Sequence, residues 1–271
     1  MSKFNLFPVE IIRYNSDGFT PASDMVSVEE PVLIRLFSGD DDSLFKDVSV
    51  TMRTPGNDRE LSLGFLFTEG LIREMNDVVN VEEREGEVRV QIRNFNQMDF
   101  DKVERHFYTT SSCGVCGKAS IDAVKLACPI IVPSKNWTIT NQIIRNLPET
   151  MRKLQNSFEF SGGIHACGLF DLEGNLLDLT EDVGRHNALD KLIGRALERG
   201  EVPMFNRIVL LSGRASFELV QKASMAGVRM ICAIGAPSSL AVELAEEYHI
   251  TLIGFLRENR FNIYTASERV G

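Results

Sequence analysis

The chain has 271 residues, of which 44% are hydrophobic and 25% charged, with a formal net charge of −9. This composition is typical of a soluble globular protein, and the length accommodates one large domain or two small ones. The negative charge argues against general nucleic-acid binding, because such binding needs basic patches that neutralise phosphates. No run of about 18 apolar residues is present, so we expect no transmembrane helix and no membrane partner.

The cysteine content and the N-terminal residues indicate the cellular compartment. The chain has 5 cysteines, an odd number, and only two of them lie close together in sequence. This pattern fits a reduced cytoplasmic protein better than a secreted disulfide framework. Residues 1–8 lack the long apolar stretch of a secretory signal. We therefore expect a cytoplasmic protein.

The first half of the chain is predicted to be rich in strands. The predicted strands cover residues 32–37, 47–52, 78–83 and 87–93. A polar turn joins the first two strands, which indicates a hairpin, and the Glu85-Gly86 turn separates the last two. Between the two pairs, Asp58 is predicted to cap a helix that ends near Gly70.

The second half of the chain alternates strands with helices. The predicted strands cover residues 164–170, 175–179, 207–211, 229–234 and 251–255. The predicted helices cover residues 138–156, 185–199, 215–226 and 237–247. This alternation is typical of an α/β sheet with helices on both faces. Pro129 and Pro133 mark a soft boundary between a smaller N-terminal β-rich subdomain (1–130) and an α/β domain (131–271), and one continuous domain is the alternative.

A small, glycine-rich loop over residues 111–117 contains two cysteines, Cys113 and Cys116. Such a pair can form a redox disulfide, contribute half of a metal site, or relay sulfane sulfur. Lys118 and the start of a candidate helix favour the thiolate forms. A zinc site needs further ligands, and no second cysteine pair is present. The mid-chain position does not fit a thioredoxin-like protein, and buried structural cysteines fit poorly among serines and glycines. We therefore favour an accessible, thiol-reactive loop without a metal.

Two histidines occur in polar surroundings in the second half. His165 follows a glycine turn, and for an isolated histidine we favour a hydrogen-bonded side chain in a half-buried strand. Residues 181–187 (Glu-Asp-Val-Gly-Arg-His-Asn) place two carboxylates before a helix whose first turn carries His186. Asp190 lies four residues later, where its carboxylate can orient this imidazole. Capping by Asp182 is the structural alternative, but the density of polar residues favours a site.

Two loops that follow apolar strands have the features of anion-binding turns. Residues 212–216 (Ser-Gly-Arg-Ala-Ser) follow one strand and begin a helix, and residues 236–239 repeat this arrangement. Backbone N–H groups at a helix N-terminus bind anions, and Arg214 adds a positive charge. Residues 255–260 (Phe-Leu-Arg-Glu-Asn-Arg) contribute two more arginines after the last predicted strand. Together these loops predict a phosphate-bearing ligand at the carboxyl ends of the strands.

The assembled motifs resemble the FdhD family of sulfur carrier proteins, which are required for formate dehydrogenase activity. The resemblance covers roughly residues 29–270. It rests on Glu29-Glu30-Pro31, Thr54-Pro55-Gly56, Gly64-Phe65-Leu66, Glu69-Gly70, Ser111 to Gly117, Gly162-Gly163 with His165, Glu181 to Ala188, Asp190-Lys191, Ser212-Gly213-Arg214 and Gly254-Phe255. The combination of Cys-Gly-Val-Cys with Glu-Asp-Val-Gly-Arg-His-Asn-Ala is highly specific.

The resemblance implies a sulfurtransferase that takes persulfide sulfur from a cysteine desulfurase. The sulfur passes to the molybdenum of a bis(molybdopterin guanine dinucleotide) cofactor, which is bound as a substrate before its insertion into formate dehydrogenase. Cys113 matches the persulfide-bearing cysteine of the family and Cys116 the second relay thiol. The candidate cofactor-binding residues are Ser212, Gly213, Arg214, His186, Phe255, Leu256, Arg257, Glu258, Asn259 and Arg260.

The resemblance also implies a fold like that of cytidine deaminase, a mixed sheet with helices on both faces, and a homodimer. Deaminases bind zinc through a His-x-Glu motif followed by Pro-Cys-x-x-Cys. Here the cysteine pair precedes the histidine, and the segment His165-Ala166-Cys167 lacks the glutamate. We therefore expect the deaminase architecture without a zinc deaminase activity. The alternative function is a non-catalytic chaperone that binds the molybdenum cofactor and escorts it to formate dehydrogenase.

Overall fold

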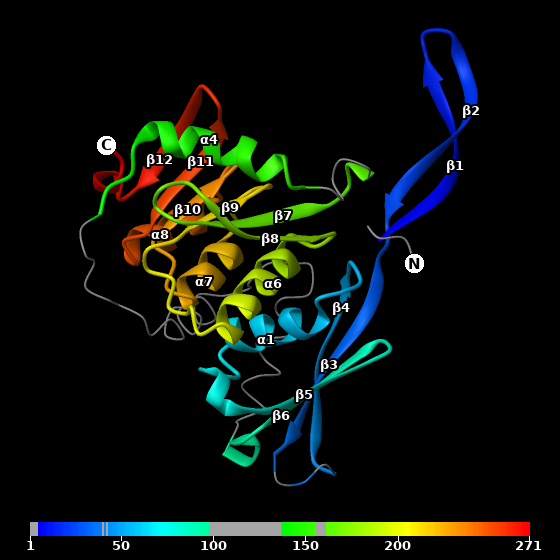
Figure 1. The fold of residues 1–271 in the computed structure, drawn as a ribbon, viewed down its shortest axis with the longest axis vertical. Helices are drawn as coiled ribbons and strands as arrows, with labels where there is room; N and C mark the ends of the chain where they lie inside the picture. The colour runs from blue at the N-terminus through cyan, green and yellow to red at the C-terminus, as the bar shows by residue number, and fades with distance from the viewer. Residues whose placement is uncertain (1–4, 40, 42, 98–136, 156–160) are drawn as a thin grey trace.

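The computed structural model describes residues 5–39, 41, 43–97, 137–155 and 161–271. The cysteine loop and the two prolines at the predicted boundary lie outside these residues. Within the described residues the strands form three sheets, of two, four and six strands (Figure 1). The strands are β1 (Leu6–Asn15), β2 (Gly18–Ser27), β3 (Glu30–Ser38), β4 (Phe45–Arg53), β5 (Val78–Arg84), β6 (Glu87–Ile92), β7 (His165–Phe170), β8 (Leu176–Asp182), β9 (Ile208–Leu211), β10 (Met230–Ala233), β11 (Thr251–Arg257) and β12 (Arg260–Thr265).

The helices lie close to their predicted positions. They are α1 (Asp58–Thr68), α4 (Asn141–Arg152), α6 (Arg185–Glu198), α7 (Phe217–Met225) and α8 (Ser239–Glu247). One predicted cap is wrong by a residue. Asn57, with φ 59°, is the N-cap of α1, and Asp58 is its first helical residue. No helix in the described ranges is long and apolar enough to cross a membrane.

The six-stranded sheet has the strand order β12-β11-β10-β9-β7-β8. Strands β9, β10 and β11 are parallel, and the other pairs are antiparallel. Every residue of β9 and β10 is buried, as expected for strands covered on both faces. Helix α4 covers one face, and helices α6, α7 and α8 cover the other (Figure 1). This arrangement confirms the predicted mixed α/β sheet with helices on both faces.

The four-stranded sheet has the strand order β4-β3-β6-β5 and forms a separate layer, built from the first part of the chain. Val32, Ile34 and Leu36 alternate along β3 and are each 0% exposed, because they face the same core. Helix α1 packs on this sheet and also against α6. One apolar cluster therefore includes residues from both sides of the predicted boundary, Leu66 and Leu189 among them. The division into residues 1–130 and 131–271 stays a prediction.

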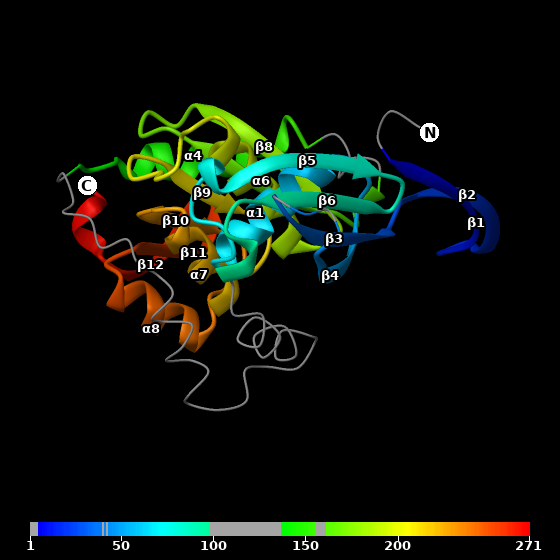
Figure 2. The ribbon, with the colours of Figure 1, turned by 90° about the horizontal axis from the view of Figure 1, so that it is seen from below.

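Two glycines allow α1 and α6 to approach very closely. A Cβ atom on Gly64 would collide with the backbone carbonyl of Asp190, and one on Gly194 would collide with that of Glu60. This close contact joins the four-stranded layer to α6, the helix that begins beside the predicted site. The β1–β2 hairpin, in contrast, projects away from the rest of the molecule (Figure 2).

Candidate functional site

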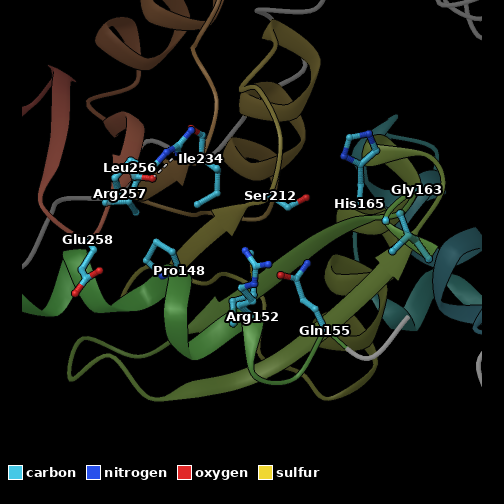
Figure 3. A pocket seen from close by; sticks show the side chains of 13 residues that line it. Pro148, Arg152, Gln155, Gly163, His165, Ser212, Ile234, Leu256, Arg257 and Glu258 are labelled. Atoms are coloured by element: carbon cyan, nitrogen blue, oxygen red, sulfur yellow. Dashed lines mark hydrogen bonds between the residues drawn. The ribbon is translucent and has the colours of Figure 1, made fainter. Parts of the chain in front are cut away.

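A pocket of about 660 Å³ lies where β9, β10 and β11 end, against the last turns of α4 (Figure 3). Ser212 follows β9, Ile234 follows β10, and Leu256 and Arg257 end β11. Open α/β sheets bind their ligands at this edge, outside the carboxyl ends of parallel strands. The structure therefore contains a pocket at the edge where the sequence predicts an anionic ligand.

Helix α4 supplies one wall of the pocket. Thr140 caps this helix by accepting a hydrogen bond from the backbone N–H of Ile143. Pro148, Met151 and Arg152 line the pocket from one helical face, and Gln155 continues that face just beyond the helix end. These four residues have the spacing i, i+3, i+4 and i+7, which aligns side chains along one side of a helix. None of them was predicted as a site residue.

The opposite wall combines apolar side chains with fixed polar groups. Ile164, Ile234 and Leu256 provide the apolar surface. The Ser212 hydroxyl oxygen accepts a hydrogen bond from the backbone N–H of Ala166 at 2.8 Å. No described residue accepts a hydrogen bond from this hydroxyl, so its proton is available to a ligand.

The charged side chains of the pocket favour an anion. Nη1 of Arg257 donates to the carbonyls of Ile234 and Leu256, each at 2.7 Å, which fixes this guanidinium at the end of β10. Arg152 contributes a second positive charge, and Glu258 contributes one negative charge. Arginine side chains are suited to phosphate because the planar guanidinium donates two parallel hydrogen bonds. The lining is therefore net positive in a chain that is net negative.

His165 lies at the other end of the pocket, although an isolated histidine in a strand is predicted to have a structural role. Gly213 packs beside it, and a Cβ atom there would lie 3.3 Å from Nδ1 of the imidazole. Burial lowers the pKa of His165 below its usual value, and the neighbouring Arg185 and His186 lower it further. The imidazole is therefore neutral near pH 7, with one nitrogen that donates and one that accepts. In the sequence, the Gly162-Gly163 turn before His165 was the feature that could have identified this histidine as a pocket residue.

His186 does not line the pocket, and its predicted partner is wrong. Its Nε2 lies 2.9 Å from Oε2 of Glu218 and 3.4 Å from the hydroxyl oxygen of Ser216. The hydrogen bond from His186 lowers the pKa of Glu218, against the opposing effect of burial. Asp190 instead lies 3.0 Å from Nζ of Lys222. Asp190 is buried at the α1–α6 contact, where it cannot reach the imidazole.

Asp182 does not cap α6 as predicted, because Gly184 is the N-cap and no side-chain hydrogen bond caps this helix. Its role is structural in another way. It is 0% exposed, and its carboxylate accepts hydrogen bonds from the backbone N–H groups of Gly184 and Thr54 at 2.8 and 3.1 Å. Nζ of Lys191 lies 2.7 Å from the same carboxylate and donates to the carbonyl of Thr54 at 2.8 Å. Much of the polar motif at residues 181–191 therefore joins the β4–α1 connection to α6.

The three loops after β9, β10 and β11 lie side by side. The N–H of Gly235 donates to the carbonyl of Gly213 at 2.8 Å, and the N–H of Phe255 donates to the carbonyl of Gly235 at 3.0 Å. Among the predicted cofactor-binding residues, the following line the pocket: Ser212, Leu256, Arg257 and Glu258. Gly213 contacts His165 beside it, whereas the following lie outside the lining: Arg214, His186, Phe255, Asn259 and Arg260. The predicted catalytic residues Cys113 and Cys116 lie outside the described residues.

Comparisons with known proteins agree over nearly the whole chain. A protein from Streptomyces coelicolor named sulfur carrier protein FdhD is 42% identical, covering 96% of this chain and 94% of its own. Proteins of the same name from Picrophilus torridus and Saccharolobus solfataricus are 46% and 41% identical, covering 92% and 96% of this chain and the same shares of their own.

A solved structure shows the same fold. It is a protein from Desulfotalea psychrophila described as a formate dehydrogenase accessory protein, with a TM-score of 0.76 and 24% sequence identity. The similarity covers 98% of this chain and 99% of that one. The profile of the FdhD/NarQ family matches residues 28–271. The chain therefore belongs to the FdhD/NarQ family.

Proposed function

We propose that this protein is a sulfurtransferase that receives sulfur from a cysteine desulfurase on Cys113. It delivers the sulfur to the molybdenum of a bis(molybdopterin guanine dinucleotide) cofactor, which formate dehydrogenase requires. The names of the relatives support the role of a sulfur carrier. The observation that carries the identity of the acceptor is the pocket at the strand ends, whose two arginines and apolar walls suit a nucleotide with its phosphates.

The proposed chemistry balances in two steps. The Cys113 thiolate attacks the terminal sulfur of the desulfurase persulfide, the sulfur–sulfur bond of the donor breaks, and the donor cysteine leaves as a thiolate. The Cys116 thiolate then attacks the inner sulfur of the Cys113 persulfide. Hydrosulfide is released to molybdenum, and a Cys113–Cys116 disulfide forms, so Cys116 supplies the electron pair. A thiol reductant restores both thiols before the next cycle.

The pocket residues bind and orient the nucleotide part of this substrate. Arg257 faces the phosphates with a guanidinium that two carbonyls already hold in place. Arg214, exposed on the neighbouring loop, extends the positive surface. The neutral imidazole of His165 donates or accepts one hydrogen bond at the far end of the pocket. The apolar walls exclude water from the base.

The proposed partners are the desulfurase, formate dehydrogenase and a second copy of this chain in a homodimer. Exposed apolar side chains support protein contacts, because large exposed apolar patches mark interaction surfaces. On the β1–β2 hairpin, Tyr14 and Phe19 are 70% and 76% exposed. Val50 on the edge strand β4 is 67% exposed.

Mass spectrometry of the protein after incubation with a cysteine desulfurase and cysteine tests the proposal. We expect an added mass of one sulfur atom on the wild type, none on Cys113→Ala, and a persistent adduct on Cys116→Ala. Cys167→Ala is the matched control, because this thiol is 1% exposed and should not take part. Equal sulfur loading of Cys113→Ala and the wild type would exclude the proposed persulfide site.

A further inference from the structure

One buried donor atom at the start of α6 has no acceptor. Arg185 is the first helical residue of α6, and its Nε atom is buried without a hydrogen-bond partner. The rest of its guanidinium forms no hydrogen bond and no ion pair with a described residue. Unpaired buried donors are costly, and native proteins retain few of them. The Arg185 side chain therefore indicates a ligand that supplies the missing acceptor.

The first turn of α6 adds backbone donors to this guanidinium. Gly184 is the N-cap of the helix and has no side chain that could accept a hydrogen bond. No described residue accepts a hydrogen bond from the backbone N–H groups of Arg185 and His186. The first N–H groups of a helix have no acceptor within the helix, and they bind anions readily. An anion at this helix end meets donors from both the backbone and Arg185.

Helix α7 begins beside the same point. Its N-cap, Ser216, makes no side-chain capping hydrogen bond, and the hydroxyl oxygen of Ser216 lies 3.4 Å from Nε2 of His186. The same nitrogen lies 2.9 Å from Oε2 of Glu218, in the first turn of α7. Two helix N-termini therefore lie side by side, and the positive ends of both helix dipoles favour a bound negative charge.

The neighbouring carboxylates do not neutralise Arg185. Burial lowers the pKa of His165 and the positive charge of Arg185 lowers it further, which places these two side chains near each other. Glu218 is within hydrogen-bond distance of His186, and the buried carboxylate of Asp182 is held by other partners. Neither carboxylate forms an ion pair with Arg185. Its positive charge is therefore available to an anionic ligand.

This cluster lies across the sheet edge from the pocket. Helices α6 and α7 cover one face of the six-stranded sheet, and α4, which supplies a wall of the pocket, covers the other. His165 lines the pocket and also lies near Arg185, whereas Arg185 is not part of the pocket lining. The cluster is therefore separate from the pocket described above.

We infer that Arg185 and the first turn of α6 bind a tetrahedral oxyanion of the phosphate and sulfate class, beside the N-terminus of α7. A planar guanidinium donates two parallel hydrogen bonds to two oxygens of one anion, which chloride, with a single atom, does not match. A further oxygen accepts from the backbone N–H groups at the helix end. This site goes beyond the proposed function, because it needs neither Cys113 nor the lining of the pocket.

NMR titration of the full chain with sodium sulfate tests this assignment, with sodium chloride at equal ionic strength as the reference. We expect sulfate to shift the side-chain signals of His165 and His186 in a saturable way. It should also raise the midpoints of both imidazole titrations, because a nearby anion favours the charged form. Arg185→Gln should weaken sulfate binding about tenfold or more, since a charged hydrogen bond is lost. Arg185→Lys should bind with intermediate affinity, because it keeps the charge without the paired donors.

Arg199→Gln is the matched control, because Arg199 lies at the other end of α6 and its side chain is 50% exposed. It should bind sulfate like the wild type. In sulfate-free buffer, Arg185→Gln should unfold at the wild-type temperature, since no described residue loses a bond. It should also raise the midpoint of His165, because a positive neighbour is removed.

Three outcomes would overturn the inference. Chloride would reproduce the sulfate shifts, Arg185→Gln would bind sulfate as tightly as the wild type, or Arg185→Gln would unfold earlier in sulfate-free buffer. The last result would assign Arg185 a structural role.

Inorganic phosphate and GDP distinguish the sources of the oxyanion. Phosphate should compete with sulfate, and its failure to compete would also overturn the assignment. If GDP does not compete, the site takes a free oxyanion. If GDP competes and Arg185→Gln weakens GDP binding, the oxyanion is a phosphoryl group of a ligand that also occupies the neighbouring pocket.

Discussion

The Asp182–Lys191 ion pair gives the strongest stability prediction. Both side chains are buried, with exposed fractions of 0% and 2%, so solvent does not screen the pair. Asp182→Asn keeps the shape of the side chain but removes its charge. The buried Lys191 ammonium then loses the counter-charge that the described residues provide, although it still donates to the Thr54 carbonyl. Breaking a buried pair in this way costs about 3–5 kcal/mol of the free energy of unfolding.

Urea unfolding followed by circular dichroism measures this cost, and a double-mutant cycle isolates the pair. Lys191→Met should cost less than Asp182→Asn, because the carboxylate keeps the N–H donors of Gly184 and Thr54. The double variant should be more stable than the sum of the single effects predicts. Lys153→Met, which breaks an exposed pair with Glu149, is the control and should leave the free energy of unfolding nearly unchanged, because solvent screens that pair. An Asp182→Asn effect below about 1 kcal/mol, or strict additivity, would refute the reasoning.

Three further predictions concern packing, protonation and thiol reactivity. Gly194→Ala should destabilise the protein by about 1–3 kcal/mol in the same unfolding assay, since the added methyl meets the α1 backbone, and an effect near zero would contradict the close helix contact. The NMR titration of His165 should have its midpoint below about 6.5, because burial lowers its pKa. The contribution of the neutral His165 imidazole to the free energy of unfolding is then lost as the pH falls through that midpoint. A midpoint above about 6.5 would be inconsistent with a buried neutral imidazole. Alkylation of the native protein should spare Cys167 and Cys232, whose pKa values burial raises, and should modify both in urea.

The sequence predicted most of the α/β half because its signals are local. Strands β9 and β10 are continuous apolar runs, and such runs alternating with amphipathic helices identify a covered sheet. Strand β12 and the β1–β2 hairpin were missed for the opposite reason. Each of these strands has at most one buried residue, so none contains the continuous buried apolar run that marks β9 and β10.

The site was predicted only where it follows strand ends. Ser212 and Arg257 come directly after, or at the end of, apolar strands, so their common edge follows from topology. Arg152 and Gln155 reach the same pocket because α4 packs across the sheet. No local sequence motif indicates where on the sheet this helix packs. Asp190 shows the same limit. Helical spacing places it on the His186 side, but Lys222 from another helix is its actual partner.

Delivery of radiolabelled sulfur tests the central claim most directly. The protein is loaded by a desulfurase with labelled cysteine, separated from the donor, and mixed with the molybdenum cofactor with or without excess GDP. We expect label to leave Cys113 for the cofactor, and we expect GDP to block this delivery without affecting the loading. Label that stays on the protein in the presence of cofactor, or delivery that excess GDP does not slow, would contradict this claim.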